Sequence, residues 1–154
     1  MEIADLVAFD AVLAKTKASG KKQALQEVGH RAADVYGVDC GRAIEGLLAR
    51  ERLGSTAMGS GVAIPHARLD GLDRIVGLFV QLEKPVDFEA ADNQGVDLIF
   101  ALLAPEEAGA DHLRALAKVS RIMRDEAMRS KLRGCDSREA IHSLLTDMSA
   151  SRAA

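Results

Sequence analysis

The fold is decided by RIVGLFVQL at residues 74–82 and VDLIFALLA at residues 96–104. In both stretches apolar side chains occupy the two alternating sets of positions, which is typical of strands that are covered on both faces. A sheet buried in this way needs packed layers on each side of it. The two stretches therefore predict a buried sheet within an α/β architecture.

The rest of the chain shows the helical repeat of apolar residues, with start and stop signals at the segment ends. Helices are predicted at residues 21–36 and 39–54, and the helical pattern returns after Pro105 and runs to Met123, with His112 in the opening turn. A short helix is predicted after Asp125, ending at Gly134, and a last one begins with Asp136 and Glu139 in capping-box spacing. Helices before and after buried strands imply a layered α/β sandwich. Neither a linker nor a repeat divides the chain, so we expect a single domain over residues 1–154.

Composition excludes several classes of protein. The 154 residues suit one domain, and 20 basic against 23 acidic residues are interspersed, which argues against a nucleic-acid or membrane surface. No apolar run reaches the roughly 20 residues that span a bilayer, and early Glu2 and Asp5 do not fit a secretory signal. Cys40 and Cys135 form no CxxC pattern, which fits thiols in a reducing cytoplasm.

His66 stands at an unusual position, after a loop and a short extended segment. Residues 55–61, STAMGSG, are small or hydroxyl-bearing and predict a loop. Residues 62–65 are expected to be extended, because Pro65 keeps Ile64 out of the helical region. A neutral imidazole is a competent nucleophile near pH 7, since its unperturbed pKa is about 6.5. Attack of His66 on a phosphoryl donor would give a phosphoramidate.

Such a transfer needs positioning and hydrogen-bonding or positive groups around the phosphoryl oxygens. The loop offers hydroxyls and glycine amides, at Ser55, Thr56, Gly59, Ser60 and Gly61. Arg50 would add a guanidinium if the chain turns back at Gly54. His112, at a predicted helix start, would add a second imidazole and the positive end of a helix.

Each of these features also has a purely structural interpretation. His66 could serve only as a hydrogen-bonding residue, and Arg50 as a solvated residue at a helix end. The loop could be only a turn, and His112 only a surface residue near a cap. We assign His30 and His142 to structural positions on helices. The glycines match neither a dinucleotide nor a Walker loop, and no pair of histidines has metal-ligand spacing, so neither a cofactor nor a metal is predicted.

Residues 53–56, LGST, and residues 61–66, GVAIPH, resemble the phosphorylation-site signature of enzyme IIA proteins of the nitrogen-type bacterial phosphotransferase system. The similarity covers most of residues 20–147, the expected core of the domain. It continues through VGLFVQL at 76–82, DNQ at 92–94, VDL at 96–98 and DHL at 111–113.

This resemblance implies a mixed sheet of about five strands flanked by helices, as in mannitol-type and fructose-type enzyme IIA. It implies that His66 is the phosphoacceptor, through Nε2, and that Arg50 and His112 hold the phosphoryl group. The donor would be a small histidine-containing phosphocarrier protein, charged by a phosphoenolpyruvate-dependent enzyme I. The output would be regulatory, through transporters, sensor kinases or metabolic enzymes that distinguish the two forms.

The sequence departs from the family pattern at three places. Ser60 stands where Asn is common, Gly95 where Pro is common, and residues 69–74 are one residue short. Two other functions stay open. A sugar-specific enzyme IIA of the fructose or mannitol branch would pass phosphate to a transporter component, although a chain without a second domain favours the regulatory branch. A binding module would act independently of phosphorylation.

Overall fold

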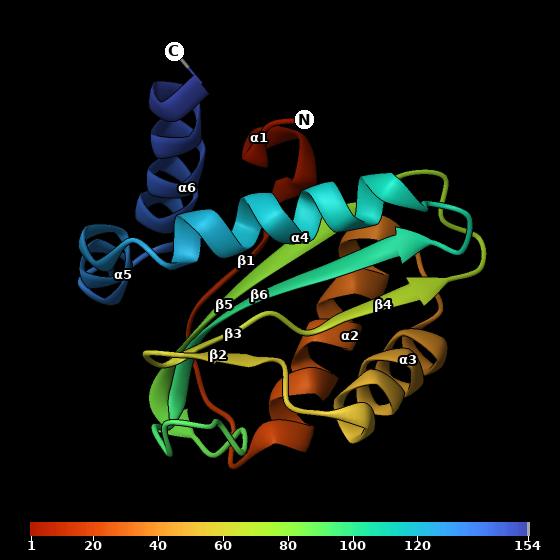
Figure 1. The fold of residues 1–154 in the computed structure, drawn as a ribbon, viewed down its shortest axis with the longest axis horizontal. Helices are drawn as coiled ribbons and strands as arrows, with labels where there is room; N and C mark the ends of the chain where they lie inside the picture. The colour runs from red at the N-terminus through yellow and green to blue at the C-terminus, as the bar shows by residue number, and fades with distance from the viewer. Residues whose placement is uncertain (154) are drawn as a thin grey trace.

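The computed structural model describes the backbone of residues 1–153 and the side chains of residues 1–147. Its centre is a mixed six-stranded sheet in the order β1-β5-β6-β3-β2, with β4 also paired to β6 (Figure 1). The strands are β1 Val7–Thr16, β2 Ala57–Gly59, β3 Val62–Ala63, β4 His66–Leu69, β5 Val76–Val86 and β6 Val96–Pro105. Only the pairs β5–β6 and β2–β3 are antiparallel. The predicted mixed sheet is confirmed.

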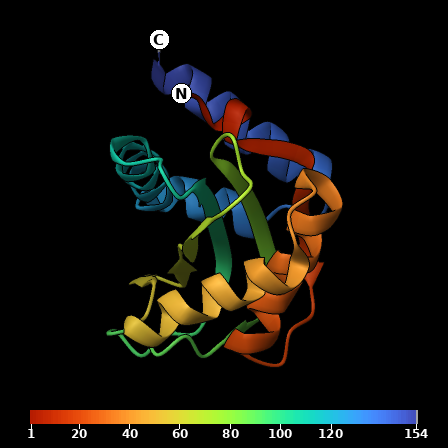
Figure 2. The ribbon, with the colours of Figure 1, turned by 90° about the vertical axis from the view of Figure 1, so that its right-hand side faces the viewer.

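Helices cover both faces of this sheet. They are α1 Ile3–Leu6, α2 Lys21–Tyr36, α3 Cys40–Leu53, α4 Ala110–Met123, α5 Glu126–Arg133 and α6 Arg138–Ala153. The views of Figures 1 and 2 place α2 and α3 on one face and α4 and α6 on the other. The layered α/β sandwich predicted from the sequence is therefore confirmed.

The two strands that decide the fold lie at the centre of the core. Nearly all of β6 and the first seven residues of β5 are buried, as apolar residues on both faces predict. Phe79 and Phe100 sit opposite each other in this pair, with ring centroids 6.0 Å apart in an edge-to-face arrangement. Aromatic contacts of this geometry stabilise a core beyond the area that they bury.

The end of α2 and the start of α3 follow the predicted signals. Gly37 closes α2 in a left-handed conformation, with φ 73°, and its N–H donates to Ala33. Asp39 caps α3 by accepting a hydrogen bond from the Arg42 amide at 2.8 Å. The start of α6 differs from the prediction, because Ser137 rather than Asp136 accepts the Ala140 amide hydrogen bond.

Residues 3–16 form structure that the sequence analysis did not predict. The core begins at Ile3, and strand β1 pairs in parallel with β5 at one edge of the sheet. The burial pattern along β1 is irregular and its pairing contains two register shifts, so its apolar residues follow no clean period of two. The core therefore extends ahead of the predicted boundary near residue 20.

The predicted loop at residues 55–61 contains a strand. Ala57–Gly59 forms β2 and pairs with β3 through a hairpin whose central residues are Ser60 and Gly61. Both have positive φ, 59° and 78°, as a tight type I′ hairpin requires. The extended segment that follows is interrupted at Pro65, which has no N–H to donate to a neighbouring strand.

Within the described residues, no helix combines the length and the apolar character needed to cross a membrane.

Candidate functional site

His66 is the first residue of β4, where it pairs with Leu102 of β6. Its ring is half-buried, and Nδ1 lies 2.9 Å from the carbonyl oxygen of Ile64. A carbonyl oxygen only accepts hydrogen bonds, so Nδ1 carries the proton of the neutral ring. Nε2 is then the nitrogen with the free electron pair, which makes it the nucleophilic atom of His66.

Burial lowers the pKa of His66, and the positive charge of Arg50 lowers it further. The hydrogen bond to Ile64 and the carboxylate of Glu51 act in the opposite direction but do not outweigh burial. Desolvation disfavours the charged form of an imidazole. His66 is therefore mainly neutral at pH 7, the state in which Nε2 can attack an electrophile.

His112 lies in the first turn of α4 and is only 5% exposed, so it is not the surface residue of the alternative interpretation. Its ring meets that of His66 edge to face, with centroids 5.5 Å apart and planes at 78°. Nδ1 accepts a hydrogen bond from Nε of Arg68 at 3.2 Å. Burial lowers the pKa of His112, with smaller contributions from His66 and Arg68.

Arg50 reaches the same place from the last turn of α3. One of its terminal nitrogens donates to the carbonyl oxygen of Gly54 at 2.8 Å, where the chain leaves α3. Arg50, His66, Arg68 and His112 together line a cavity of about 510 Å³. The structure thus brings together the three residues predicted to carry and hold the phosphoryl group, and it adds a second guanidinium.

The family model of the phosphoenolpyruvate-dependent sugar phosphotransferase system, EIIA 2, matches residues 6–148. The chain belongs to this family. Among curated relatives of the EIIA-2 chain is a nitrogen regulatory protein of Bradyrhizobium diazoefficiens. It is 52% identical over 145 residues, which cover 94% of this chain and 95% of the relative.

Solved structures agree with this assignment. The nitrogen regulatory protein IIA-Ntr from Neisseria meningitidis is 34% identical, with a TM-score of 0.87 over 94% of this EIIA-2 chain and 99% of its own. The IIA mannitol structure from Escherichia coli shares the fold, with a TM-score of 0.75 at 21% identity over 90% and 97% of the two chains. The resemblance to nitrogen-type enzyme IIA is therefore confirmed.

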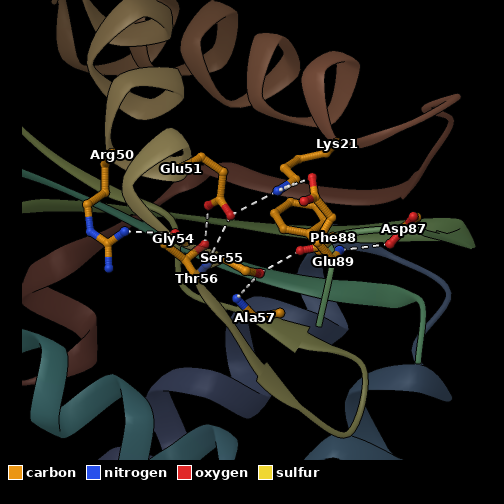
Figure 3. A network of polar contacts seen from close by, with 10 residues as sticks. All are labelled: Lys21, Arg50, Glu51, Gly54, Ser55, Thr56, Ala57, Asp87, Phe88 and Glu89. Atoms are coloured by element: carbon orange, nitrogen blue, oxygen red, sulfur yellow. Dashed lines mark hydrogen bonds and ion pairs between the residues drawn. The ribbon is translucent and has the colours of Figure 1, made fainter. Parts of the chain in front are cut away.

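Ser55 and Thr56 of the EIIA-2 chain lie beside the site, but their hydroxyls are engaged in other contacts (Figure 3). The Ser55 hydroxyl donates to the carbonyl oxygen of Phe88, and the Thr56 hydroxyl donates to the buried carboxylate of Glu51. The carbonyl oxygen of Thr56 accepts the Ile64 amide at 3.0 Å. These two residues fix the segment that leads to His66, and they do not present free hydroxyls to a phosphoryl group.

The structure does not bring Gly59, Ser60 and Gly61 to His66. Val62 pairs with Leu98 while His66 pairs with Leu102, and four residues of strand correspond to about 13 Å. The Ser60 amide donates to Asp92 at 2.9 Å, and the Ser60 carbonyl accepts from Arg133 at 2.7 Å. Residues 59–61 therefore form a hairpin turn that side chains hold at the end of β3 away from His66. The prediction that they form an anion-binding loop around His66 differs from this arrangement.

Two residues of the site were missed by the sequence analysis. Glu51 is 7% exposed, accepts the Thr56 amide at 2.9 Å and lies 3.3 Å from the amino group of Lys21. Arg68 lies two residues after His66, and alternation along a strand puts both on one face. A prediction of β4 would have placed Arg68 beside His66, and the helical spacing from the buried Ala43 and Leu47 places Glu51 on the buried face of α3.

The departures from the family pattern at Ser60 and Gly95 lie outside the cavity. Ser60 adopts φ 59°, a conformation in which asparagine is enriched, and is exposed at the hairpin turn. A Cβ built on Gly95 would lie 2.8 Å from the Cβ of Pro85, so a proline at 95 would require Pro85 to move. The His66 cavity does not depend on either residue.

His30 and His142 lie away from the cavity. His30 is exposed on α2. His142 on α6 has Nε2 3.2 Å from the Val7 carbonyl oxygen and meets the Phe9 ring edge to face. Among residues 1–147, no cluster of three or more His, Cys, Asp or Glu side chains could hold a metal ion.

Proposed function

We propose that this nitrogen-regulatory IIA-type protein is a phosphohistidine carrier. His66 would accept a phosphoryl group from a histidine-containing phosphocarrier protein, and the state of His66 would then control binding to regulated partners. One observation carries this proposal. The Nδ1 atom of His66 is held by Ile64, which leaves Nε2 as the nucleophile in a cavity shared with two guanidinium groups and a second imidazole.

The transfer exchanges one nitrogen–phosphorus bond for another. The electron pair on Nε2 of His66 forms the new bond to phosphorus while the bond from phosphorus to the donor nitrogen breaks. The donor ring, protonated at its other nitrogen, leaves with that electron pair as a neutral imidazole. Nδ1 of His66 keeps its proton on the Ile64 carbonyl oxygen, so protons and charge balance. No small-molecule cofactor takes part, and the protein contributes by positioning and by stabilising charge on the phosphoryl oxygens.

Arg50 is the residue that we expect to compensate this charge most directly. Its guanidinium is permanently positive and lines the cavity while its other contact is to the Gly54 carbonyl oxygen. His112 would add a neutral N–H donor from the opposite wall. A phosphoryl dianion in this cavity would therefore replace a locally positive surface by a negative one, which a partner protein can distinguish.

The rim of the cavity fits a protein donor better than a small molecule. Leu53, which lines the cavity, is 84% exposed, and Leu113, next to His112, is 67% exposed. Beside His66 and His112 these two leucines offer apolar contact area that a protein donor can cover and a small phosphoryl donor cannot. The free thiols of Cys40 and Cys135 agree with a cytoplasmic location for this exchange.

The regulatory branch is favoured over the sugar-specific branch by the degree of similarity. The nitrogen regulatory relative is 52% identical across nearly the whole chain, whereas the IIA mannitol structure is 21% identical and supports only the fold. We infer that the regulated partners belong to classes such as transporters, sensor kinases or metabolic enzymes. A purely phosphorylation-independent binding module would bind the same partners in both states.

The experiment is labelling with phosphoenolpyruvate, enzyme I and the phosphocarrier protein. We expect one acid-labile phosphate per chain, lost in His66→Ala and kept in His30→Ala, which changes an exposed histidine on α2. Full labelling of His66→Ala would move the site elsewhere. A pull-down with phosphorylated and unphosphorylated protein then tests regulation, and identical partner sets would favour the binding module.

A further inference from the structure

Arg68 and His112 make a contact that determines the proton position on one imidazole. Nε of Arg68 donates to Nδ1 of His112 at 3.2 Å, and a terminal nitrogen of Arg68 donates to the Glu106 carbonyl oxygen at 3.4 Å. Arginine stays protonated in proteins and offers only donors. Nδ1 of His112 must therefore accept, and the proton of the neutral ring must reside on Nε2.

The Nε2 atom of His112 has no hydrogen-bond partner among the described residues, although it is shielded from solvent. Buried polar groups without a partner are rare in folded proteins, so each one calls for an explanation. The ring of His112 lies edge to face against His66 and lines the same cavity. An acceptor attached to His66 would arrive beside this N–H and complete its hydrogen bonding.

We propose that Arg68 is a positioning residue that holds His112 in the Nε2–H form, so that this N–H donates to a phosphoryl oxygen carried by His66. The proposal rests on the proposed phosphorylation of His66. In the other form, Nε2 would present an electron pair to the phosphoryl oxygens and would repel them. The lowered pKa of His112 agrees with this role, since a protonated ring could not accept from Arg68.

The position of Arg68 allows an isosteric test. The Nε atom of arginine is bonded to Cδ, as are the amide nitrogen of glutamine and the carboxylate oxygens of glutamate. Arg68→Gln therefore keeps a donor at the contact, whereas Arg68→Glu replaces it with an acceptor. Arg68 is exposed on β4, so both variants are expected to fold. Arg42→Glu, at an exposed position in the first turn of α3, is the control for the change in net charge.

Nitrogen-15 NMR of the histidine rings reads the proton position directly. We expect Nε2–H and unprotonated Nδ1 for His112 in the wild type, in Arg68→Gln and in Arg42→Glu, and the reverse in Arg68→Glu. The same samples give the rate of phosphoryl transfer from the phosphocarrier protein. Removing a preorganised donor slows related reactions by about 100-fold or more, so we expect about 100-fold slower transfer in Arg68→Glu and less than about tenfold in Arg68→Gln.

The outcomes separate the two proposals. A wild-type protein that takes up no phosphate overturns the proposed function and, with it, the role of Arg68. Labelled wild-type protein with the proton of His112 on Nδ1 overturns only the role of Arg68. Equal transfer rates in Arg68→Gln and Arg68→Glu also overturn only the role of Arg68, because a donor and an acceptor at this position would then be equivalent.

Discussion

Replacement of Glu51 tests how the site is anchored to the fold. The carboxylate of Glu51 is 7% exposed and holds three donors: the amide of Thr56, the hydroxyl of Thr56 and the amino group of Lys21 (Figure 3). Through these contacts the end of α3 is tied to the start of α2 and to the segment that leads to His66. Glu51→Ala removes all three contacts and leaves buried donors behind.

The cost can be estimated from the burial of the partners. Breaking a buried ion pair by removing one partner costs about 3–5 kcal/mol. Lys21 keeps a second carboxylate partner, the exposed Glu89 at 3.3 Å, so the cost of losing the Lys21–Glu51 pair lies at the lower end of this range. The unsatisfied Thr56 amide adds to the loss, and we expect a decrease of about 3–4 kcal/mol in the free energy of unfolding. For a chain of this length that corresponds to a melting temperature about 10 °C lower.

Urea unfolding and thermal melting measure this loss. Glu45→Ala is the matched control on the same helix, since Glu45 is exposed and its pair with Arg52 at 3.5 Å is worth at most about 1 kcal/mol. Glu51→Gln should lie between the two, because it keeps one acceptor for Thr56 but loses the charge. A Glu51→Ala protein as stable as Glu45→Ala would refute the anchoring role of this carboxylate.

Three further outcomes are expected. Arg50→Ala should slow phosphoryl transfer by about 10- to 100-fold with a change in unfolding free energy below about 1 kcal/mol, and unchanged transfer kinetics would remove Arg50 from the site. Gly29→Ala should destabilise the protein by about 1–3 kcal/mol, because a Cβ there would lie 2.3 Å from Cγ1 of Ile44; a melt equal to wild type would contradict this packing. The pKa of both His66 and His112 is lowered in the fold, so the unfolded chain binds more protons below about pH 6.5. The stability that depends on these two neutral rings is therefore complete above that pH and is lost as the pH falls. Urea titrations at about pH 7.5 and about pH 5.5 measure this loss in unfolding free energy. A His66→Gln/His112→Gln double variant is expected to lose less stability between the two pH values than the wild type.

Helix positions were predictable because their signals are local. The left-handed Gly37 and the Asp39 cap fix a chain reversal between two helices within three residues, and the structure keeps both. The buried strands β5 and β6 were predictable because apolar residues occupy both faces. The strand at Val7–Thr16 was not, since its irregular pairing with β5 breaks the alternation on which such a prediction depends.

The candidate site was predictable in its chemistry and less so in its geometry. His66, Arg50 and His112 were found because their side chains suit phosphoryl transfer, and the structure brings them together around one cavity. Gly59 and Gly61 suggested anion binding, but proximity in sequence to His66 becomes separation in space when the intervening chain is extended. Sequence patterns identify which groups a site can use, and the strand register decides which of them reach it.

The end of α3 shows why the missed carboxylate matters for the site. Arg50 and Glu51 are consecutive on a helix, so their side chains leave the axis about 100° apart. Arg50 therefore turns toward the His66 cavity, whereas Glu51 turns into the protein and binds Lys21 and Thr56 (Figure 3). Because the Thr56 carbonyl oxygen pairs with the Ile64 amide, and Ile64 in turn orients the ring of His66, the contacts of Glu51 set the position of the nucleophile relative to Arg50. The guanidinium and the imidazole are thus positioned from one helix turn, by two adjacent residues that face different environments.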